Sequence, residues 1–269
     1  MLATSLLARI EGRARYLRAA DLLDRLGVET PQQIAIEAIA EFCGATIVQE
    51  KLTGAEARIV GYRDRAIITV NSTSSIARQR FSAAHELGHW MHDRGEVSRG
   101  CLASEFISQW SRYNPEVRAN RFAAELLMPT RLFRESAKGR PLTFVTVAEL
   151  AAQFQTSLTA TAMRLLDCST RPALLVCSRR NRREWFRRSP NVPMSLSPVT
   201  RLPVHSLASR IARGENCHGP DEVKAEEWLA RVAMEGQYVH EDSIRLGREY
   251  VLTLLSWQNE SDLMHVDGF

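Results

Sequence analysis

The sequence predicts an α+β fold, because segments with helical periodicity and segments with strand-like alternation occur in separate blocks along the chain. Apolar residues recur at helical spacing before residue 45 and alternate with polar residues up to residue 71. Helical spacing then returns beyond residue 76. With 269 residues and a hydrophobic content of 45%, the chain can form one large domain or two to three small ones.

Two helices are predicted before the first strand. Residues 2–26 carry apolar side chains mostly at helical spacing. The second helix is expected to begin at a capping box formed by Thr30 and Gln33 and to end at Gly44, a residue type that often terminates helices.

Three strands are predicted next, because polar and apolar residues alternate over residues 45–50, 57–62 and 66–71. Asp64 and Arg65 are expected to form the hairpin turn between the last two strands. An exposed strand of this sheet could hold an extended peptide by accepting it as a further strand.

The most informative segment runs from Arg80 to His92 and contains His-Glu-x-x-His within a predicted helix. Residues four apart lie on one helix face, so His85 and His89 can direct both imidazoles at one metal ion. Glu86 can reach a water molecule activated by that metal without binding the metal itself. The pattern indicates peptide-bond hydrolysis, although two packed or solvated histidines are the simpler alternative. The surrounding apolar residues predict a buried helix, whose histidines need partners.

A zinc peptidase also needs a third protein ligand and an open position for water. Glu116 is the best candidate, because it lies in the first turn of a second helix predicted between the N-cap Asn114 and the terminating Pro129. Glu125 on the same helix and His92 on the first helix are alternative ligands. An acidic residue at a helix start can also serve only to interact with the helix dipole.

Two sequence blocks in this region carry a family resemblance. Residues 80–89 read Arg-Phe-x-x-Ala-His-Glu-Leu-Gly-His, and residues 116–129 read Glu-x-x-Ala-Asn-x-Phe-Ala-x-x-Leu-Leu-Met-Pro. These blocks resemble the ImmA/IrrE metallopeptidase family, in which the glutamate opening the second block is the third metal ligand, here Glu116. The close resemblance covers about residues 57–130. It implies a zincin-like zinc metallopeptidase domain with a small β-sheet over residues 1–130, with Mn2+ as an alternative to Zn2+.

The resemblance also implies the substrate. Enzymes of this family are endopeptidases that cleave a helix-turn-helix (XRE-type) transcriptional repressor and thereby switch on a stress response or mobile-element genes. The expected partner is therefore a protein substrate, which the residues themselves do not identify. A DNA-binding transcriptional regulator with a structural zinc site is the competing hypothesis.

Residues 143–167 resemble a helix-turn-helix, with a tight turn near residues 155–157. A helix that reads DNA should be polar and basic, but the second helix offers only Arg164 and two threonines. A packing role is therefore favoured over direct DNA binding. Members of the family commonly have such a segment here, and we assign it to residues 131–171.

Residues 172–269 are predicted to form a second α/β core. A proline-punctuated connection spans residues 190–203, and a helix is expected over residues 223–234. The IrrE branch of the resembling family carries a GAF-like sensor domain at this position. Strands are expected over residues 173–177, 184–186, 238–240 and 250–257.

Basic residues cluster within residues 178–188, although the formal net charge of the whole chain is only +4. An exposed hairpin that turns at an asparagine is the favoured interpretation of this cluster. Contact with an acidic partner or with nucleic acid is the alternative.

A cytoplasmic location is expected from the cysteines and from the apolar segments. Five cysteines are an odd number, and none has C-x-x-C spacing, which argues against a disulfide framework and against a structural zinc site. The sequence contains neither a basic leader followed by an apolar core nor an apolar run of about 20 residues. We therefore expect neither secretion nor a membrane partner.

Overall fold

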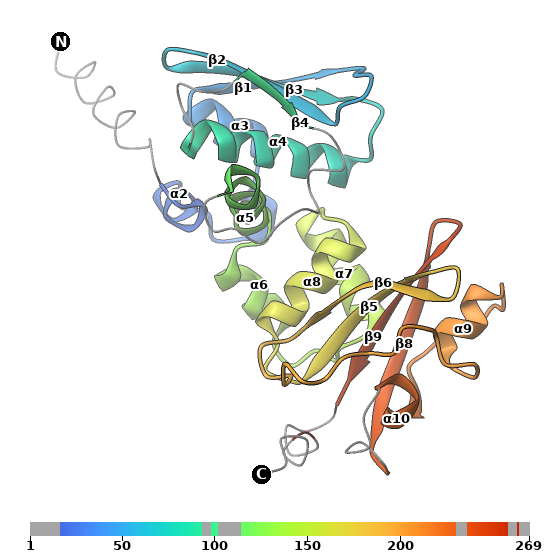
Figure 1. The fold of residues 1–269 in the computed structure, drawn as a ribbon. Coiled ribbons are helices and arrows are strands. Elements are labelled where there is room, and N and C mark those ends of the chain that lie inside the picture. The colour runs from blue at the N-terminus through green and yellow to red at the C-terminus, as the bar shows by residue number, and fades with distance from the viewer. Residues whose placement is uncertain (1–16, 93–97, 102–113, 230–235, 258–262, 264–269) are drawn as a thin grey trace. The chain divides into compact units, whose positions relative to one another are not determined.

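The computed structural model describes residues 17–92, 98–101, 114–229, 236–257 and 263. The chain divides into two compact units (Figure 1), Met1–Ser136 with Ala152–Ser157 and Ala137–Ala151 with Leu158–Phe269. Each unit combines helices with one β-sheet, which confirms the predicted α+β class. Within the described part of the chain, no helix is both long and apolar enough to cross a membrane.

The first unit contains a four-stranded mixed sheet in the order β1-β3-β2-β4 (Figure 1). Its strands are β1 (Ala45–Glu50), β2 (Ala57–Tyr62), β3 (Arg65–Asn71) and β4 (Ser98–Cys101). β1 is parallel to β3, whereas β2 is antiparallel to both β3 and β4. The three predicted strands are confirmed. The hairpin turn lies at Arg63 and Asp64, one residue earlier than predicted, and Arg63 adopts a left-handed conformation with φ 54°.

Helices α2 (Ala19–Arg25) and α3 (Ile36–Phe42) precede this sheet. Residues 1–16 of the predicted first helix lie outside the described residues. The predicted start of the second helix was wrong. Thr30 and Gln33 do form a capping box, but it opens the short 3-10 helix η1 (Pro31–Gln33). Ala35 is extended (φ −89°, ψ 98°), so the α-helix begins only after it.

Helix α4 (Ile76–His92) covers one face of the sheet together with α3 (Figure 1). Residues 82–91 are all buried, as the apolar surroundings of the motif predict. Gly61 of β2 allows close packing against this helix, because a Cβ atom there would lie 2.6 Å from the Trp90 ring. The Trp90 indole N–H donates a hydrogen bond to the Cys43 carbonyl at 2.9 Å, which satisfies this buried group.

Helix α5 (Pro115–Leu127) packs against the opposite side of α4 from the sheet (Figure 1). It begins as predicted, since the Asn114 side chain accepts a hydrogen bond from the Glu116 backbone N–H at 2.9 Å. Gly88 allows the two helices to meet almost backbone to backbone. A Cβ atom on Gly88 would lie 3.0 Å from the Cα atom of Ala119 and 3.2 Å from its carbonyl oxygen.

Three further helices follow, α6 (Thr130–Ala137), α7 (Phe144–Phe154) and α8 (Leu158–Cys168). α7 and α8 match the helix pair predicted over residues 143–167. In the first unit, the buried Phe154 ring packs on Phe133 of α6, with 5.2 Å between ring centroids. In the second unit, α8 packs on β5 (Ala173–Arg179). Its buried residues are Thr161, Ala162, Leu165 and Leu166.

The second unit contains a five-stranded antiparallel sheet in the order β6-β5-β9-β8-β7 (Figure 1). The remaining strands are β6 (Arg182–Arg188), β7 (Asp221–Lys224), β8 (Tyr238–Leu246) and β9 (Tyr250–Ser256). The four predicted strands are confirmed in position, and three of them are longer than predicted. The hairpin with an asparagine turn is also confirmed, because Arg180 and Asn181 have φ angles of 47° and 66°.

The predicted helix over residues 223–234 is confirmed only in part. Val223 lies in β7 and pairs with Val239 of β8, and among the described residues of this range only Ala225–Trp228 (α10) is helical. Residues 230–235 lie outside the described residues. The extended backbone of Leu229 ends α10 at once, and Leu229 forms an isolated antiparallel bridge with Pro198.

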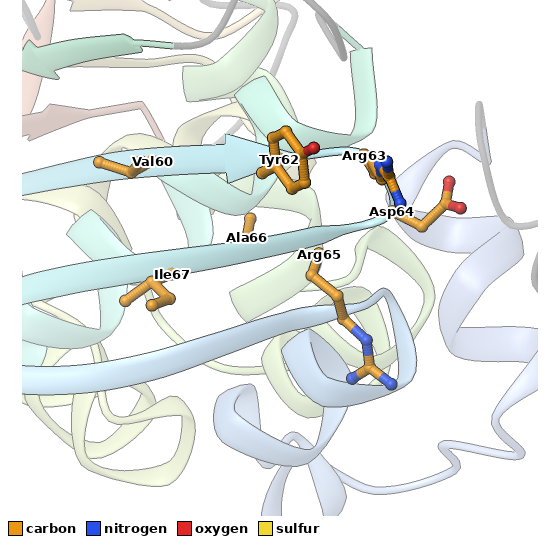
Figure 2. A pocket seen from close by; sticks show the side chains of 7 residues that line it. All are labelled: Val60, Tyr62, Arg63, Asp64, Arg65, Ala66 and Ile67. Carbon is orange, nitrogen blue, oxygen red and sulfur yellow. The ribbon is translucent and has the colours of Figure 1, made fainter.

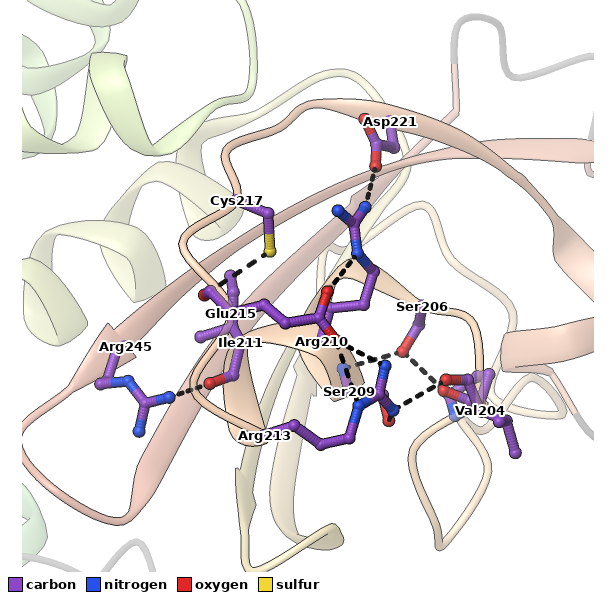
Figure 3. Close-up of polar contacts among 11 residues, drawn as sticks. Val204, Ser206, Ser209, Arg210, Ile211, Arg213, Glu215, Cys217, Asp221 and Arg245 are labelled. Carbon is purple, nitrogen blue, oxygen red and sulfur yellow. Dashed lines mark hydrogen bonds and ion pairs between the residues drawn. The ribbon is translucent and has the colours of Figure 1, made fainter.

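Helix α9 (Leu207–Ala212) lies in the long connection between β6 and β7, where the sequence predicted no helix. The Ser206 side chain caps it by accepting a hydrogen bond from the Ser209 backbone N–H at 3.1 Å. Figure 3 shows how arginines tie the end of α9 to its surroundings. Arg213 binds Glu215 at 3.0 Å, and Arg245 of β8 donates a hydrogen bond to a carbonyl of α9.

Two adjacent acidic residues of β8 are buried and hold the starts of two helices. The fully buried Glu241 accepts hydrogen bonds from the Ala208 backbone N–H of α9 at 2.7 Å and from the Trp228 indole N–H at 3.0 Å. Asp242 accepts a hydrogen bond from the Phe144 backbone N–H of α7 at 2.7 Å. Burial raises the pKa of both carboxyl groups above their ordinary values.

Replacing Glu241 with Ala should therefore destabilise the protein by about 3 kcal/mol, because it leaves buried N–H donors of Ala208 and Trp228 without an acceptor. Urea unfolding of the full chain measures this loss. Glu241→Gln keeps one acceptor oxygen and should lose clearly less. Equal stability of the Ala variant and the unaltered protein would contradict this role for Glu241.

Candidate metal centre

Three predicted ligands converge from two helices of the first unit. The Nε2 atoms of His85 and His89 on α4 lie 3.1 Å apart. Glu116 on α5 directs Oε2 to His85 Nε2 at 3.1 Å and Oε1 to His89 Nε2 at 3.2 Å. The donor atoms of the three residues all lie within 4.8 Å of one another.

Burial of these side chains follows from their places on the helices. His85 and His89 lie one turn apart on the buried face of α4, with the His85 ring fully buried and the His89 side chain 7% exposed. Glu116 lies in the first turn of α5 and remains 19% exposed. The donor group therefore lies at the boundary of the core, and solvent reaches it at Glu116.

The geometry of the donor group fits a divalent metal ion. Zinc bound to histidine nitrogen and carboxylate oxygen at about 2.0–2.2 Å in tetrahedral geometry requires donor separations of about 3.3 Å. The observed separations are 3.1 and 3.2 Å. Within the described residues, no other cluster of three His, Cys, Asp or Glu side chains comes together in this way.

The charge of Glu116 also suits a metal ligand. Hydrogen bonds with the His85 imidazole first, and then with that of His89, hold the pKa of the Glu116 carboxyl well below its ordinary value. Glu116 is therefore ionised at neutral pH, which a carboxylate ligand requires.

Asn120 contacts the outer nitrogen of one histidine. Its Oδ1 atom lies 3.0 Å from His85 Nδ1. With Nδ1 as the hydrogen-bond donor, the His85 ring is oriented so that Nε2 faces the other donor atoms. No role was predicted for Asn120 from the sequence, although its spacing of four residues from Glu116 on α5 places both on one helix face.

Replacing Asn120 with Ala should weaken metal binding by about 10- to 100-fold, because His85 loses the acceptor that orients its ring. Competition with a chromogenic zinc chelator measures the affinity directly. Asn120→Asp retains an acceptor oxygen and should restore most of the affinity. Unchanged affinity in the Ala variant would exclude this orienting role.

Glu86 is fully buried on α4, immediately after His85 and three residues before His89. It does not belong to the converging donor group. The structure therefore does not place Glu86 among the residues that could bind the metal.

The two alternative ligands have other contacts. Both carboxylate oxygens of Glu125 accept hydrogen bonds from Thr130, from its backbone N–H at 2.9 Å and from its hydroxyl at 2.8 Å. Glu125 therefore caps the start of α6. The His92 ring packs edge-on against Phe122, with 5.6 Å between ring centroids, and lies outside the donor group.

An open hollow on the first unit lies away from this centre (Figure 2). It is formed by the β2–β3 hairpin, with the exposed side chains of Val60, Tyr62 and Ile67 along it. These side chains are on the sheet face opposite α4, since the alternate residues Ile59 and Ile68 are buried on the helix side. The hollow therefore takes no part in the metal centre.

Comparison with known proteins matches residues 40–166 to the model of the Peptidase M78 family, described as the IrrE N-terminal-like domain. Residues 40–166 form an IrrE-like domain. The matched range includes α4 and α5, so His85, His89 and Glu116 all belong to the IrrE-like domain. The match to this family indicates a metallopeptidase.

Eleven chains of solved structures also match this protein. One is a transcriptional regulator of Mycobacterium tuberculosis, with 16% sequence identity and a TM-score of 0.57. The match covers 99% of this chain and 98% of that one, which shows a shared fold along the whole length. No curated protein matches the chain.

Proposed function

We propose that this protein is an intracellular zinc-dependent endopeptidase that cleaves a helix-turn-helix transcriptional repressor of the XRE type. The convergence of His85, His89 and Glu116 within 4.8 Å carries the proposal. Membership of residues 40–166 in the IrrE-like family supports a metal-dependent peptidase. Cleavage of the repressor would relieve repression in a stress response or in mobile-element regulation.

In this proposal, His85, His89 and Glu116 hold the ion through two nitrogen atoms and one carboxylate. When bound there, a divalent ion supplies Lewis acidity, which polarises a peptide carbonyl and lowers the pKa of water. The Glu86 carboxylate accepts the proton of the attacking water and then delivers it to the leaving amine. Asn120 orients His85 through the 3.0 Å contact with Nδ1.

The donor set favours a catalytic centre over a structural one. A structural zinc site is usually closed by four protein ligands, whereas a catalytic site retains a position for water. Among the described residues, the donor group contains three members. The competing hypothesis of a DNA-binding regulator with a structural zinc is therefore less well supported. Two imidazoles and a carboxylate accept Zn2+ and also Mn2+.

The domain assignment belongs to the same proposal. We assign residues 1–130 to a zincin-like peptidase domain, residues 131–171 to a helix-turn-helix-like segment and residues 172–269 to a GAF-like sensor domain. The five-stranded antiparallel sheet of the second unit supports the last assignment, because helices cover both of its faces. Cys177 and Cys217 of the second unit are free thiols, which suits a cytoplasmic protein.

Incubation of the full chain with the repressor encoded next to it tests the proposal. Mass spectrometry should detect two complementary repressor fragments, and a chelator should prevent their formation. Added zinc should restore cleavage. Fragments that form equally well in the presence of the chelator would exclude the metal-dependent mechanism, and an intact repressor under all conditions would exclude this substrate.

A further inference from the structure

Arginines are frequent along one edge of the second unit. The β5–β6 hairpin and the segments that contact it carry seven arginines and three acidic residues, an excess of four positive charges. The arginines are Arg179, Arg180, Arg182, Arg183, Arg187, Arg188 and Arg201, and the acidic residues are Asp167, Glu184 and Glu249.

Two of the acidic residues neutralise only part of this charge. Glu249, in the turn between β8 and β9, binds Arg179 at 2.5 Å and Arg180 at 2.6 Å. Asp167 of α8 binds Arg187 at 2.8 Å. One carboxylate thus binds two guanidinium groups at the hairpin tip. The remaining arginines are Arg182, Arg183 and Arg188 of β6 and Arg201 of the connection that follows it.

Arg182 and Arg201 face each other without an acidic partner. They form an isolated antiparallel bridge between β6 and the connection that follows it. Both are exposed, and no acidic side chain of the described residues pairs with either. Like charges directly opposite one another destabilise a sheet, so an anion bound between these two groups would relieve their repulsion.

Two further arginines of β6 hold their charged groups over an aromatic ring. The guanidinium carbon of Arg183 lies 4.9 Å from the Phe186 ring centroid, and that of Arg188 lies 5.2 Å from the same centroid. Both also donate hydrogen bonds to backbone carbonyls, those of Pro198 and Met194. These contacts restrict both side chains, and no acidic side chain in the described part of the chain forms an ion pair with either.

We propose that the arginine edge, defined as Arg182, Arg183, Arg188 and Arg201, binds the phosphodiester backbone of duplex DNA. Guanidinium groups bind phosphate oxygens in a planar, bidentate geometry, and two-stranded β-ribbons are known elements of DNA-binding proteins. The arginine edge is a second binding surface, and it belongs to a different unit from the metal centre.

The backbone of β6 argues against an acidic peptide as the partner. A peptide would gain most of its affinity by pairing as a further strand along a free sheet edge. Near the hairpin tip this edge is already occupied, because the Arg183 backbone N–H donates to the Thr200 carbonyl at 2.8 Å. The charged arginine side chains remain accessible at this edge. Binding of a phosphate backbone requires these side chains and no pairing with the strand backbone.

Fluorescence anisotropy of the full chain with a short labelled duplex of random sequence tests this proposal. The unaltered protein should bind at low salt, with an affinity that falls steeply as salt rises. The double variant Arg182→Ala/Arg201→Ala should bind about 60-fold more weakly at about 0.1 M salt. Each lost phosphate contact reduces the slope of log K against log salt concentration by about 0.9, so two lost contacts lower log K by about 1.8 at this salt concentration.

A charge-matched control is the double variant Arg25→Ala/Arg134→Ala, which removes two exposed arginines of the first unit. It should bind as the unaltered protein does, and a chelator should have no effect. Full binding by the Arg182/Arg201 variant, or loss of binding in the control alone, would overturn the proposal. Loss of binding in Arg164→Ala alone would assign the contact to α8 instead. Equally tight binding of poly-glutamate would identify an acidic protein as the partner.

Discussion

Replacing Glu86 with Gln should abolish peptide-bond cleavage and leave metal binding unchanged. Gln is nearly isosteric with Glu but cannot accept and return a proton, so the expected loss in kcat is about 10²- to 10⁴-fold. Because Glu86 is outside the group of converging donors, the affinity for zinc should not change. Repressor cleavage followed by mass spectrometry gives the rate, and competition with a chelator gives the affinity.

The two measurements together identify the role of Glu86. A variant that loses zinc as well as activity would make Glu86 a ligand or a structural residue. A variant that cleaves at the original rate would remove Glu86 from the mechanism. Because this side chain is fully buried, circular dichroism of the variant must first show that the fold is retained.

Replacing Glu116 with Ala should remove zinc binding and activity together. The affinity should fall by more than the roughly 10- to 100-fold expected for loss of an outer contact, because a ligand itself is removed. Glu125→Ala is the matched control, since it changes the same residue type on the same helix. Its carboxylate caps Thr130, so this variant should lose about 1 kcal/mol of stability but retain the metal.

Zinc retained by Glu116→Ala and lost by Glu125→Ala would reverse the assignment of the third ligand. Inductively coupled plasma mass spectrometry of the purified variants gives the bound metal, and urea unfolding gives the stability. The two variants therefore distinguish a glutamate that binds the metal from one that caps a helix.

The helices of the metal centre could be predicted from the sequence because their signals are local. Asn114 and Pro115 mark the start of α5, and the predicted end before Pro129 agrees with the observed C-cap at Met128. The buried face of α4 follows from its apolar neighbours. Glu116 was the best candidate for the third ligand because of its place in the first turn of α5, and the family resemblance supported this choice. The structure brings Glu116 to the two histidines.

Other features depend on contacts between distant residues and could not be predicted in this way. Val223 belongs to β7 because it pairs with Val239, sixteen positions further along the chain. The hydrogen bonds of Glu125 to Thr130 could not be foreseen either, because they form only once α6 is in place. The approach of α5 to α4 depends on the missing side chain of Gly88, which no periodicity reveals.

The neighbouring acids of β8 also fix the alignment of that strand. Successive side chains of a strand point to opposite faces, so a slip of one position would exchange the surroundings of Glu241 and Asp242. The longer carboxylate would then face the start of α7 and the shorter one the start of α9, and the bonds to Phe144 and Ala208 would be lost together. A misaligned strand would thus leave two helix ends unsatisfied at once, which favours the native pairing from both sides of the sheet.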